Sequence, residues 1–138
     1  KIHCGASGAG QAAKMCNNMM LGIQMSSVAE AFILAESLGL DAQKLFDVSS
    51  TASGQCWSLT NYCPVPGPVP TSPANNNYKP GFATALMLKD MNLALDAAKS
   101  AGVDVSVAES AAKIYSSYSE AGGDGKDFSG IIEHIRKS

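Results

Sequence analysis

The stretch from Gly10 to Leu38 most constrains the fold of this chain. Almost thirty residues pass without a proline, and most are apolar or strong helix formers. They predict one long first helix that ends at Gly39, a residue suited to the left-handed turn that follows many helices. Apolar side chains fall on nearly every side of this helix, so we expect neighbours to bury it all round. Lys14 and several other polar residues interrupt the run, which argues against a membrane span.

The sequence also predicts helices in much of the rest of the chain. Asp41 is a favourable N-cap for a second helix that runs to about residues 48–51. Further helices are predicted at residues 84–101, 105–121 and 127–136, and glycines follow the first two. In the helix at 84–101 the residues expected to face inward are Leu86, Met87, Met91, Leu93 and Leu95. No alternation typical of a strand persists anywhere, so the predicted fold class is all-α.

One long segment interrupts the helices. Residues 53–82, SGQCWSLTNYCPVPGPVPTSPANNNYKPGF, contain all six prolines of the chain. Proline lacks the backbone N–H that regular structure needs, so we expect a long irregular loop. Loops of this length in a compact domain are usually functional or disordered. Its aromatic residues argue against disorder, which favours an ordered functional loop.

Composition narrows the class of protein and its partners. A length of 138 residues suits one domain, and a charged fraction of 16% is low. A poorly charged surface suggests that part of the chain is normally covered by another domain or subunit. The net charge of −2 and the lack of a Lys/Arg cluster argue against nucleic acid or an anionic membrane as partner. The four cysteines and two histidines lack the spacing of a metal site, and the thiols are expected to be reduced rather than paired.

Lys14 is the candidate for chemistry, because a cation is unexpected in so apolar a helix. Lys14 and Asn18 are one helical turn apart on the same face, with Gln11 just before them. Apolar neighbours would disfavour the ammonium form of the lysine, which suits a group that transfers protons. The alternative is that Lys14 extends to solvent while Asn17 and Asn18 bond to nearby backbone. The glycines at positions 5, 8 and 10 lack the spacing of a dinucleotide loop and are expected to shape a turn.

Three stretches resemble a known family. GAGQAAKMCNN resembles the substrate motif of the β-hydroxyacid dehydrogenases, G-x-G-x-x-x-K-x-x-N-N. The loop at 53–82, with its W-S-x-x-x-Y-x-P-V-P-G string, resembles that of the 3-hydroxyisobutyrate dehydrogenases within this family. GFATALMLKDMNLALDAAKSAG resembles the family segment that faces the nicotinamide cofactor. The likeness covers essentially all 138 residues, with the motifs in the expected order.

The resemblance implies a fold and a domain organisation. It places residues 1–138 as the all-helical C-terminal domain, similar to that of 6-phosphogluconate dehydrogenase, with a long central first helix. Members of the family also carry an N-terminal Rossmann domain that binds NAD, and this chain contains no βαβ unit. We therefore expect the helical half alone, inactive when isolated, with one wall of an active site that lies between two domains.

The resemblance also assigns roles to residues. Lys14 matches the catalytic lysine, and Asn18 matches the asparagine that holds the substrate hydroxyl. Asn17 and Gly10 fall in the same substrate motif. The residues implied to lie on the cofactor side are Lys89, Asp90 and Phe82. Trp57 and Tyr62 either wall the pocket for the methyl-bearing substrate or simply anchor the loop on the core, and the sequence leaves both roles open.

The implied function is oxidation of 3-hydroxyisobutyrate to methylmalonate semialdehyde with NAD⁺, a step of valine degradation. Related reactions on tartronate semialdehyde, succinic semialdehyde or serine-like substrates are alternatives, as is a noncatalytic helical module. A helix of about 28 residues would be roughly 42 Å long, too long for this small domain to cover, so we expect a dimer or tetramer. The expected location is the cytoplasm in a bacterium or the mitochondrial matrix in a eukaryote.

Overall fold

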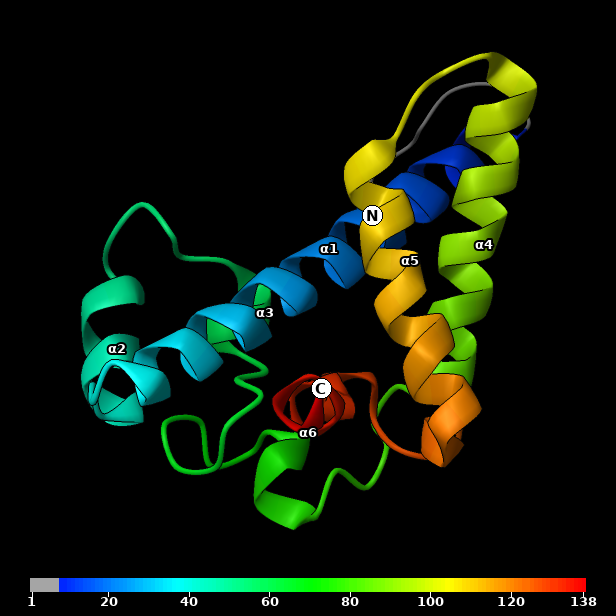
Figure 1. Ribbon diagram of the computed structural model, residues 1–138. Helices are drawn as coiled ribbons and strands as arrows, with labels where there is room; N and C mark the ends of the chain where they lie inside the picture. Colours follow the sequence, from blue (N-terminus) through cyan, green and yellow to red (C-terminus); the bar gives the residue numbers. More distant parts are fainter. Residues whose placement is uncertain (1–7) are drawn as a thin grey trace.

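The computed structural model describes residues 8–138, and over these residues the fold is helical (Figure 1). The elements, in chain order, are α1 (Ala9–Ser37), α2 (Ala42–Ser49), α3 (Trp57–Thr60), the short helix η1 (Pro73–Asn76), α4 (Thr84–Ala101), α5 (Ser106–Tyr118), the π turn η2 (Ser119–Gly123), the short helix η3 (Phe128–Gly130) and α6 (Ile131–Lys137). Within the described residues there is no strand, and one isolated antiparallel bridge joins Ala83 to Asp127. The all-α prediction is confirmed. The expectation for Gly5 lies outside the described residues.

The helix ends follow the predicted signals closely. Gly39 and Gly102 adopt left-handed backbone angles, with φ of 78° and 70°; Gly39 follows α1 after Leu38, and Gly102 follows α4 directly. This conformation is easy for glycine and costly for residues with a Cβ atom. Asp41 occupies the N-cap position of α2, although its side chain makes no capping hydrogen bond. The helix predicted at 105–121 instead ends at Tyr118 and passes into a π turn, in which Gly122 has a φ of 99°.

The core forms where α4, α5 and α6 pack against α1 (Figure 1). Fully buried side chains from each helix meet there, and the largest are Tyr115, Phe32, Phe128, Met25, Met87, Met91, Ile131 and Ile132. Gly22 lets α4 approach α1 closely, since a Cβ atom at this position would lie 2.6 Å from the Met91 sulfur. The Tyr115 hydroxyl donates a hydrogen bond to the Gly22 carbonyl oxygen at 3.2 Å. A small residue in the middle of α1 thus sets how tightly the helices pack.

Two expectations about burial are wrong. α1 is not enclosed on all sides: Met20 and Leu34 in the helix and Leu38 just after it are 50%, 59% and 74% exposed. In α4, Met87 and Met91 face inward as expected, and Leu95 is partly buried against the core, but Leu86 and Leu93 are 51% and 46% exposed. Residues seven apart share one face of a helix, so Leu86 and Leu93 form a second apolar face.

The length and composition of α1 would by themselves allow it to cross a membrane. Its most apolar window of 18 residues has a mean hydropathy of 1.2, and 39% of that window is buried inside this domain. A core helix of a soluble protein passes the same test, so this feature is weak evidence for a membrane.

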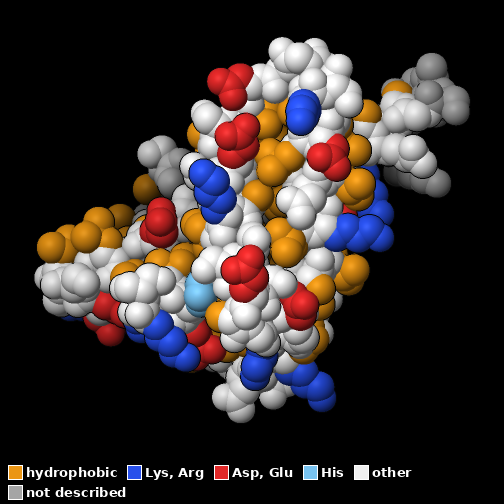
Figure 2. Space-filling model, turned by 45° about the vertical axis from the view of Figure 1, so that its right-hand side comes forward, with side chains coloured by type: hydrophobic (Ala, Val, Ile, Leu, Met, Phe, Trp, Pro, Cys, Tyr) orange, Lys and Arg blue, Asp and Glu red, His pale blue; other side chains and the backbone are white. Residues whose placement is uncertain are grey.

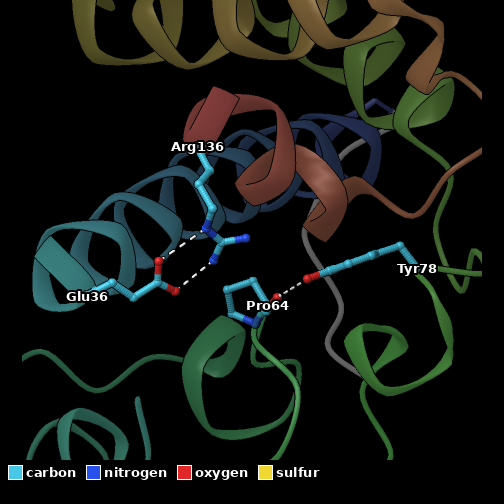
Figure 3. Close-up of polar contacts among 4 residues, drawn as sticks. All are labelled: Glu36, Pro64, Tyr78 and Arg136. Atoms are coloured by element: carbon cyan, nitrogen blue, oxygen red, sulfur yellow. Dashed lines mark hydrogen bonds and ion pairs between the residues drawn. The ribbon is translucent and has the colours of Figure 1, made fainter. Parts of the chain in front are cut away.

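The proline-rich loop is ordered and folds onto the core. Cys63, Pro64 and Val65 are buried, and the buried Tyr78 donates its hydroxyl hydrogen to the Pro64 carbonyl oxygen at 2.7 Å (Figure 3). Nearby, a bidentate ion pair joins α1 to α6: Arg136 donates through Nη2 and Nε to the two carboxylate oxygens of Glu36, at 2.7 and 3.1 Å (Figure 3). The prediction of an ordered loop therefore holds.

Candidate functional site

An open cavity of about 250 Å³ lies between the first half of α1 and α4. Its lining residues are Gln11, Lys14, Met15, Asn18, Asp90 and Leu93. The helical spacing predicted that Gln11, Lys14 and Asn18 share one face, and this cavity brings them together. Lys14 is exposed, so the residues of this chain alone do not give it the apolar enclosure that the sequence predicted.

Asn18 and Asp90 meet across this cavity. The amide nitrogen Nδ2 of Asn18 donates to Oδ2 of Asp90 at 2.8 Å, and the contact is partly buried. The two residues are 72 positions apart in the chain, and helix packing brings them together. The amide oxygen of Asn18 accepts from Nδ2 of Asn17 at 3.4 Å, a long bond. A lysine, an oriented amide and a carboxylate therefore share one open site, which can bind a small polar molecule and exchange a proton with it.

Asn17 faces a different hollow, beside the proline-rich loop. This hollow has a volume of about 370 Å³, and its lining residues are Asn17, Met20, Leu21, Gln24 and Trp57. Trp57 is 48% exposed, and its ring stacks on Tyr62 with centroids 5.1 Å apart. The predicted substrate residues thus line two different hollows: Asn17 and Trp57 line one, and Lys14 and Asn18 line the other. Lys14 and Asn17 are three residues apart on α1, so the two hollows open on adjoining parts of the helix.

Tyr62 lines neither hollow. Its hydroxyl donates to Oδ1 of the fully buried Asp127 at 2.6 Å, and its ring packs between Trp57 and Phe128. Burial, together with the hydrogen bond to Asp127, raises the pKa of Tyr62 well above its usual value, because both favour the neutral phenol. Of the two roles left open for Tyr62, these contacts fit anchoring of the loop.

Of the residues predicted to face the cofactor, Lys89 and Asp90 lie in α4 and Phe82 lies just before it. Lys89 is exposed and lines a third hollow of about 370 Å³ with Leu88, Asn92 and other residues of α4; Leu93 borders both this hollow and the Lys14 cavity. Phe82 is half-buried, with its ring edge-on to Phe128 at 5.7 Å. Gly10 lies exposed in the first turn of α1, with open space where a Cβ atom would be.

Asp127 is an important residue that the sequence did not single out. Its carboxylate accepts hydrogen bonds from the backbone N–H groups of Gly81, Phe82 and Ser129 and from the hydroxyls of Tyr62 and Ser129. This aspartate therefore joins two parts of the proline-rich loop, at Tyr62 and at Gly81 and Phe82, to the start of η3. Its place at the start of the helix predicted at 127–136 is the one local signal, since its side chain caps η3 by accepting from the Ser129 N–H. No local pattern marks its contacts with the loop, because those partners lie 45 or more residues away.

Two further findings concern metal binding and the other hollows of this domain. Among residues 8–138, no three His, Cys, Asp or Glu side chains cluster in a way that could hold a metal ion. Another hollow, about 590 Å³ between α4 and α5, contains none of the predicted site residues. Figure 2 shows hydrophobic side chains along this face between charged ones, and the groove combines Leu95 and Val105 with Asp96 and Lys113 on its walls.

Comparison with known proteins agrees with the helical fold and confirms the family resemblance. The sequence model of a family described as "NAD-binding of NADP-dependent 3-hydroxyisobutyrate dehydrogenase" matches residues 8–135. The chain belongs to this family. A protein of Mycobacterium tuberculosis (strain H37Rv) named "Probable 3-hydroxyisobutyrate dehydrogenase" is 57% identical over 98% of the chain. The mitochondrial 3-hydroxyisobutyrate dehydrogenase of Homo sapiens is 44% identical over 99% of the chain.

Solved structures give the same result. A structure described as M. tuberculosis 3-hydroxyisobutyrate dehydrogenase with L-serine matches with a TM-score of 0.94 and 57% identity, over 98% of this chain and 46% of that one. A 3-hydroxyisobutyrate dehydrogenase structure from Salmonella typhimurium matches with a TM-score of 0.81 and 28% identity, over 92% of this chain and 42% of that one. The chain spans 46% of the length of the M. tuberculosis relative and 40% of the human one.

Proposed function

We propose that this chain is the helical substrate-side domain of a dehydrogenase that oxidises 3-hydroxyisobutyrate to methylmalonate semialdehyde. The observation that carries the proposal is the cavity in which Lys14 and Asn18 lie beside Asp90, in a chain that belongs to a 3-hydroxyisobutyrate dehydrogenase family. The proposal includes the finer fold assignment, a bundle like the C-terminal domain of 6-phosphogluconate dehydrogenase. The oxidation would serve valine degradation.

Lys14 is the proposed general base of the oxidation. In its neutral form the amine accepts the proton of the substrate hydroxyl, while the C–H bond of the alcohol carbon breaks and its hydride leaves. The alcohol loses two electrons and two hydrogens in total and becomes an aldehyde. In the reverse direction the Lys14 ammonium returns the proton to the carbonyl oxygen. Asn18 holds the same oxygen, and Gly10 and Asn17 belong to the same motif.

The nicotinamide dinucleotide supplies the hydride acceptor when bound. The described residues fit only one end of such a molecule. Lys89 offers an exposed cation beside a hollow next to the Lys14 cavity, and Asp90 and Phe82 lie on the same segment. Residues 8–138 contain no strand followed by a glycine-rich turn and a helix, the usual pyrophosphate site. We therefore propose that an N-terminal Rossmann domain outside this chain holds the rest of the cofactor.

The substrate pocket has a proposed apolar side. We propose that Trp57, half-exposed at the hollow that Asn17 lines, contacts the methyl group of the substrate; the stacking of its ring on Tyr62 supports this proposal. A serine-like substrate is a second candidate, because the similar M. tuberculosis structure is described with L-serine. Tartronate and succinic semialdehydes are further members of the same chemical class.

The whole protein is proposed to work as a homo-oligomer, a dimer or tetramer, with its active site closed by its own Rossmann domain. The exposed apolar side chains of α1 and α4 support this proposal. Its location is proposed to be the cytoplasm in a bacterium or the mitochondrial matrix in a eukaryote, since the similar fly, human and Arabidopsis proteins are named as mitochondrial.

The direct test is a substrate panel with the full-length protein. Reduction of NAD⁺ and NADP⁺ is followed by absorbance with 3-hydroxyisobutyrate, L-serine, glycerate and 4-hydroxybutyrate. We expect the highest kcat/KM with 3-hydroxyisobutyrate. A higher value with L-serine would instead assign the second candidate, and no activity with any hydroxyacid would refute the proposed function.

A further inference from the structure

The hydrogen bond between Asn18 and Asp90 determines which way the Asn18 amide points. A carboxylate only accepts hydrogen bonds, so Asp90 can bind only the NH₂ side of the amide. The 2.8 Å contact therefore turns Nδ2 toward α4 and leaves Oδ1 on the other side, where Asn17 reaches it at 3.4 Å. Without Asp90 the amide could rotate by half a turn at little cost.

The orientation matters because both residues line the Lys14 cavity. The NH₂ group of Asn18 has two hydrogens, and the bond to Asp90 uses one of them. The second hydrogen remains available to an oxygen held beside Lys14. An alcohol oxygen gains negative charge as it loses its proton, so an N–H donor stabilises it and an amide oxygen would repel it.

We propose that Asp90 is a positioning residue for the oxidation: it acts through Asn18, holding an N–H of the amide toward the substrate oxygen that Lys14 deprotonates. This inference rests on the proposed function. It gives Asp90 a role different from contact with the cofactor, which the sequence implied for it.

The packing around the Asn18–Asp90 hydrogen bond indicates that Asp90 is not needed to hold the two helices together. α1 and α4 are held together by buried side chains, with Met87 and Met91 against Gly22, which lies about one turn along α1 from Asn18. No other hydrogen bond between side chains of α1 and α4 is found among residues 8–138. The Asn18–Asp90 hydrogen bond thus contributes little to holding α1 and α4 together. It lies at the Lys14 cavity, where it orients the Asn18 amide.

The test is a double-mutant cycle in the full-length protein. Asp90→Asn keeps the size of the side chain but can bind either end of the amide, and we expect kcat to fall by about 10- to 100-fold, the range for a misplaced catalytic group. The KM for the dinucleotide should stay within about twofold, because this residue does not hold the cofactor. In an Asn18→Ala background the same substitution should change kcat by less than about twofold. Asp90→Glu, which still only accepts, should recover part of the loss.

Asp104→Asn is the matched control, because Asp104 is an exposed carboxylate in the connection between α4 and α5. It should leave kcat unchanged. An equal loss from Asp90→Asn with and without Asn18, or a rise mainly in the dinucleotide KM, would overturn the inference. If the unmodified protein oxidises a hydroxyacid, needs Lys14 and tolerates Asp90→Asn, only this inference fails; if the unmodified protein is inactive, the proposed function fails and the inference falls with it.

Discussion

The hydroxyl of Tyr62 donates a hydrogen bond to Oδ1 of Asp127 at 2.6 Å, across 65 residues of sequence. The same oxygen accepts from the backbone N–H groups of Gly81 and Phe82, at 3.0 and 2.9 Å. One buried carboxylate thus joins the first part of the proline-rich loop, its last residues and the start of η3. Because Trp57 stacks on Tyr62, this network also holds the indole above the hollow that Asn17 lines.

Asp127→Ala should strongly destabilise the protein. It leaves buried donors without partners, and we expect a loss of at least about 3 kcal/mol in the free energy of unfolding, measured with urea. Tyr62→Phe removes one donor and leaves the others paired, so its loss should be smaller, about 1 to 2 kcal/mol. Comparable losses for the two variants would show that Asp127 does not act as the common anchor.

The contrast between Gly39 and Asp127 shows what the sequence can predict. Gly39 and Gly102 end their helices through their own backbone conformation, so local signals placed the ends of α1 and α4 within one residue. The path of residues 53–82 depends on Asp127, whose Tyr62, Gly81 and Phe82 partners lie far away in sequence. No local pattern carries that information.

The sequence likewise predicted part of the candidate site and missed another part. Helical spacing alone placed Gln11, Lys14 and Asn18 on one face, and the structure confirms that they line one cavity. The pairing of Asn18 with Asp90 required the packing of α1 on α4. The burial of α1 was overestimated because apolar composition does not say which neighbours are present, and this chain spans less than half the length of its M. tuberculosis relative.

Tyr78 should make stability depend on alkaline pH. Burial, and after it the negative charge of Glu133, raises the pKa of Tyr78 from 10.0 to about 12, because both favour the neutral phenol. Its stabilising contribution is complete below pH 10, where the phenol is protonated in both states. Between pH 10 and 12 the unfolded chain loses the proton first, so stability falls as pH rises.

Tyr78→Phe tests this dependence. The variant lacks the hydroxyl and should be less stable near neutral pH, by about 1 kcal/mol. It should also lose stability less steeply above pH 10, with a slope smaller by up to about 1.4 kcal/mol per pH unit. Urea midpoints of both proteins from pH 7 to 11.5 give the difference, and parallel curves would contradict the assignment.

Lys14→Ala should remove most of the activity of the full-length protein. We expect kcat to fall by about 10² to 10⁴, the usual contribution of general acid–base catalysis. Lys14→Arg should also fail, because a guanidinium keeps its proton at working pH. The dinucleotide KM should change little in either variant. Lys44→Ala, at an exposed lysine of α2, is the control, and a near-normal kcat for Lys14→Ala would remove this lysine from the mechanism.

The exposed apolar residues at the far end of α1 predict self-association. Leu34 of α1, Leu38 just after it and Val48 of α2 are 59%, 74% and 66% exposed. Exposed apolar side chains gathered in one place are typical of a surface that binds another protein subunit. We expect sedimentation of the full-length protein to show a dimer or larger, and Leu34→Glu together with Leu38→Glu to weaken it. A monomer at high micromolar concentration would contradict this prediction.

Lys89→Ala should act mainly on the cofactor. Lys89 is exposed on α4, in a hollow that borders the Lys14 cavity through Leu93, and the described residues pair it with no carboxylate. If its charge holds the nicotinamide end of the dinucleotide, the KM for the dinucleotide should rise several-fold more than the KM for the hydroxyacid. Lys99→Ala, ten residues further along the same helix, should change neither constant. Equal rises in both constants for Lys89→Ala would indicate a general loss of domain closure, and no change would leave Lys89 as a solvated surface residue.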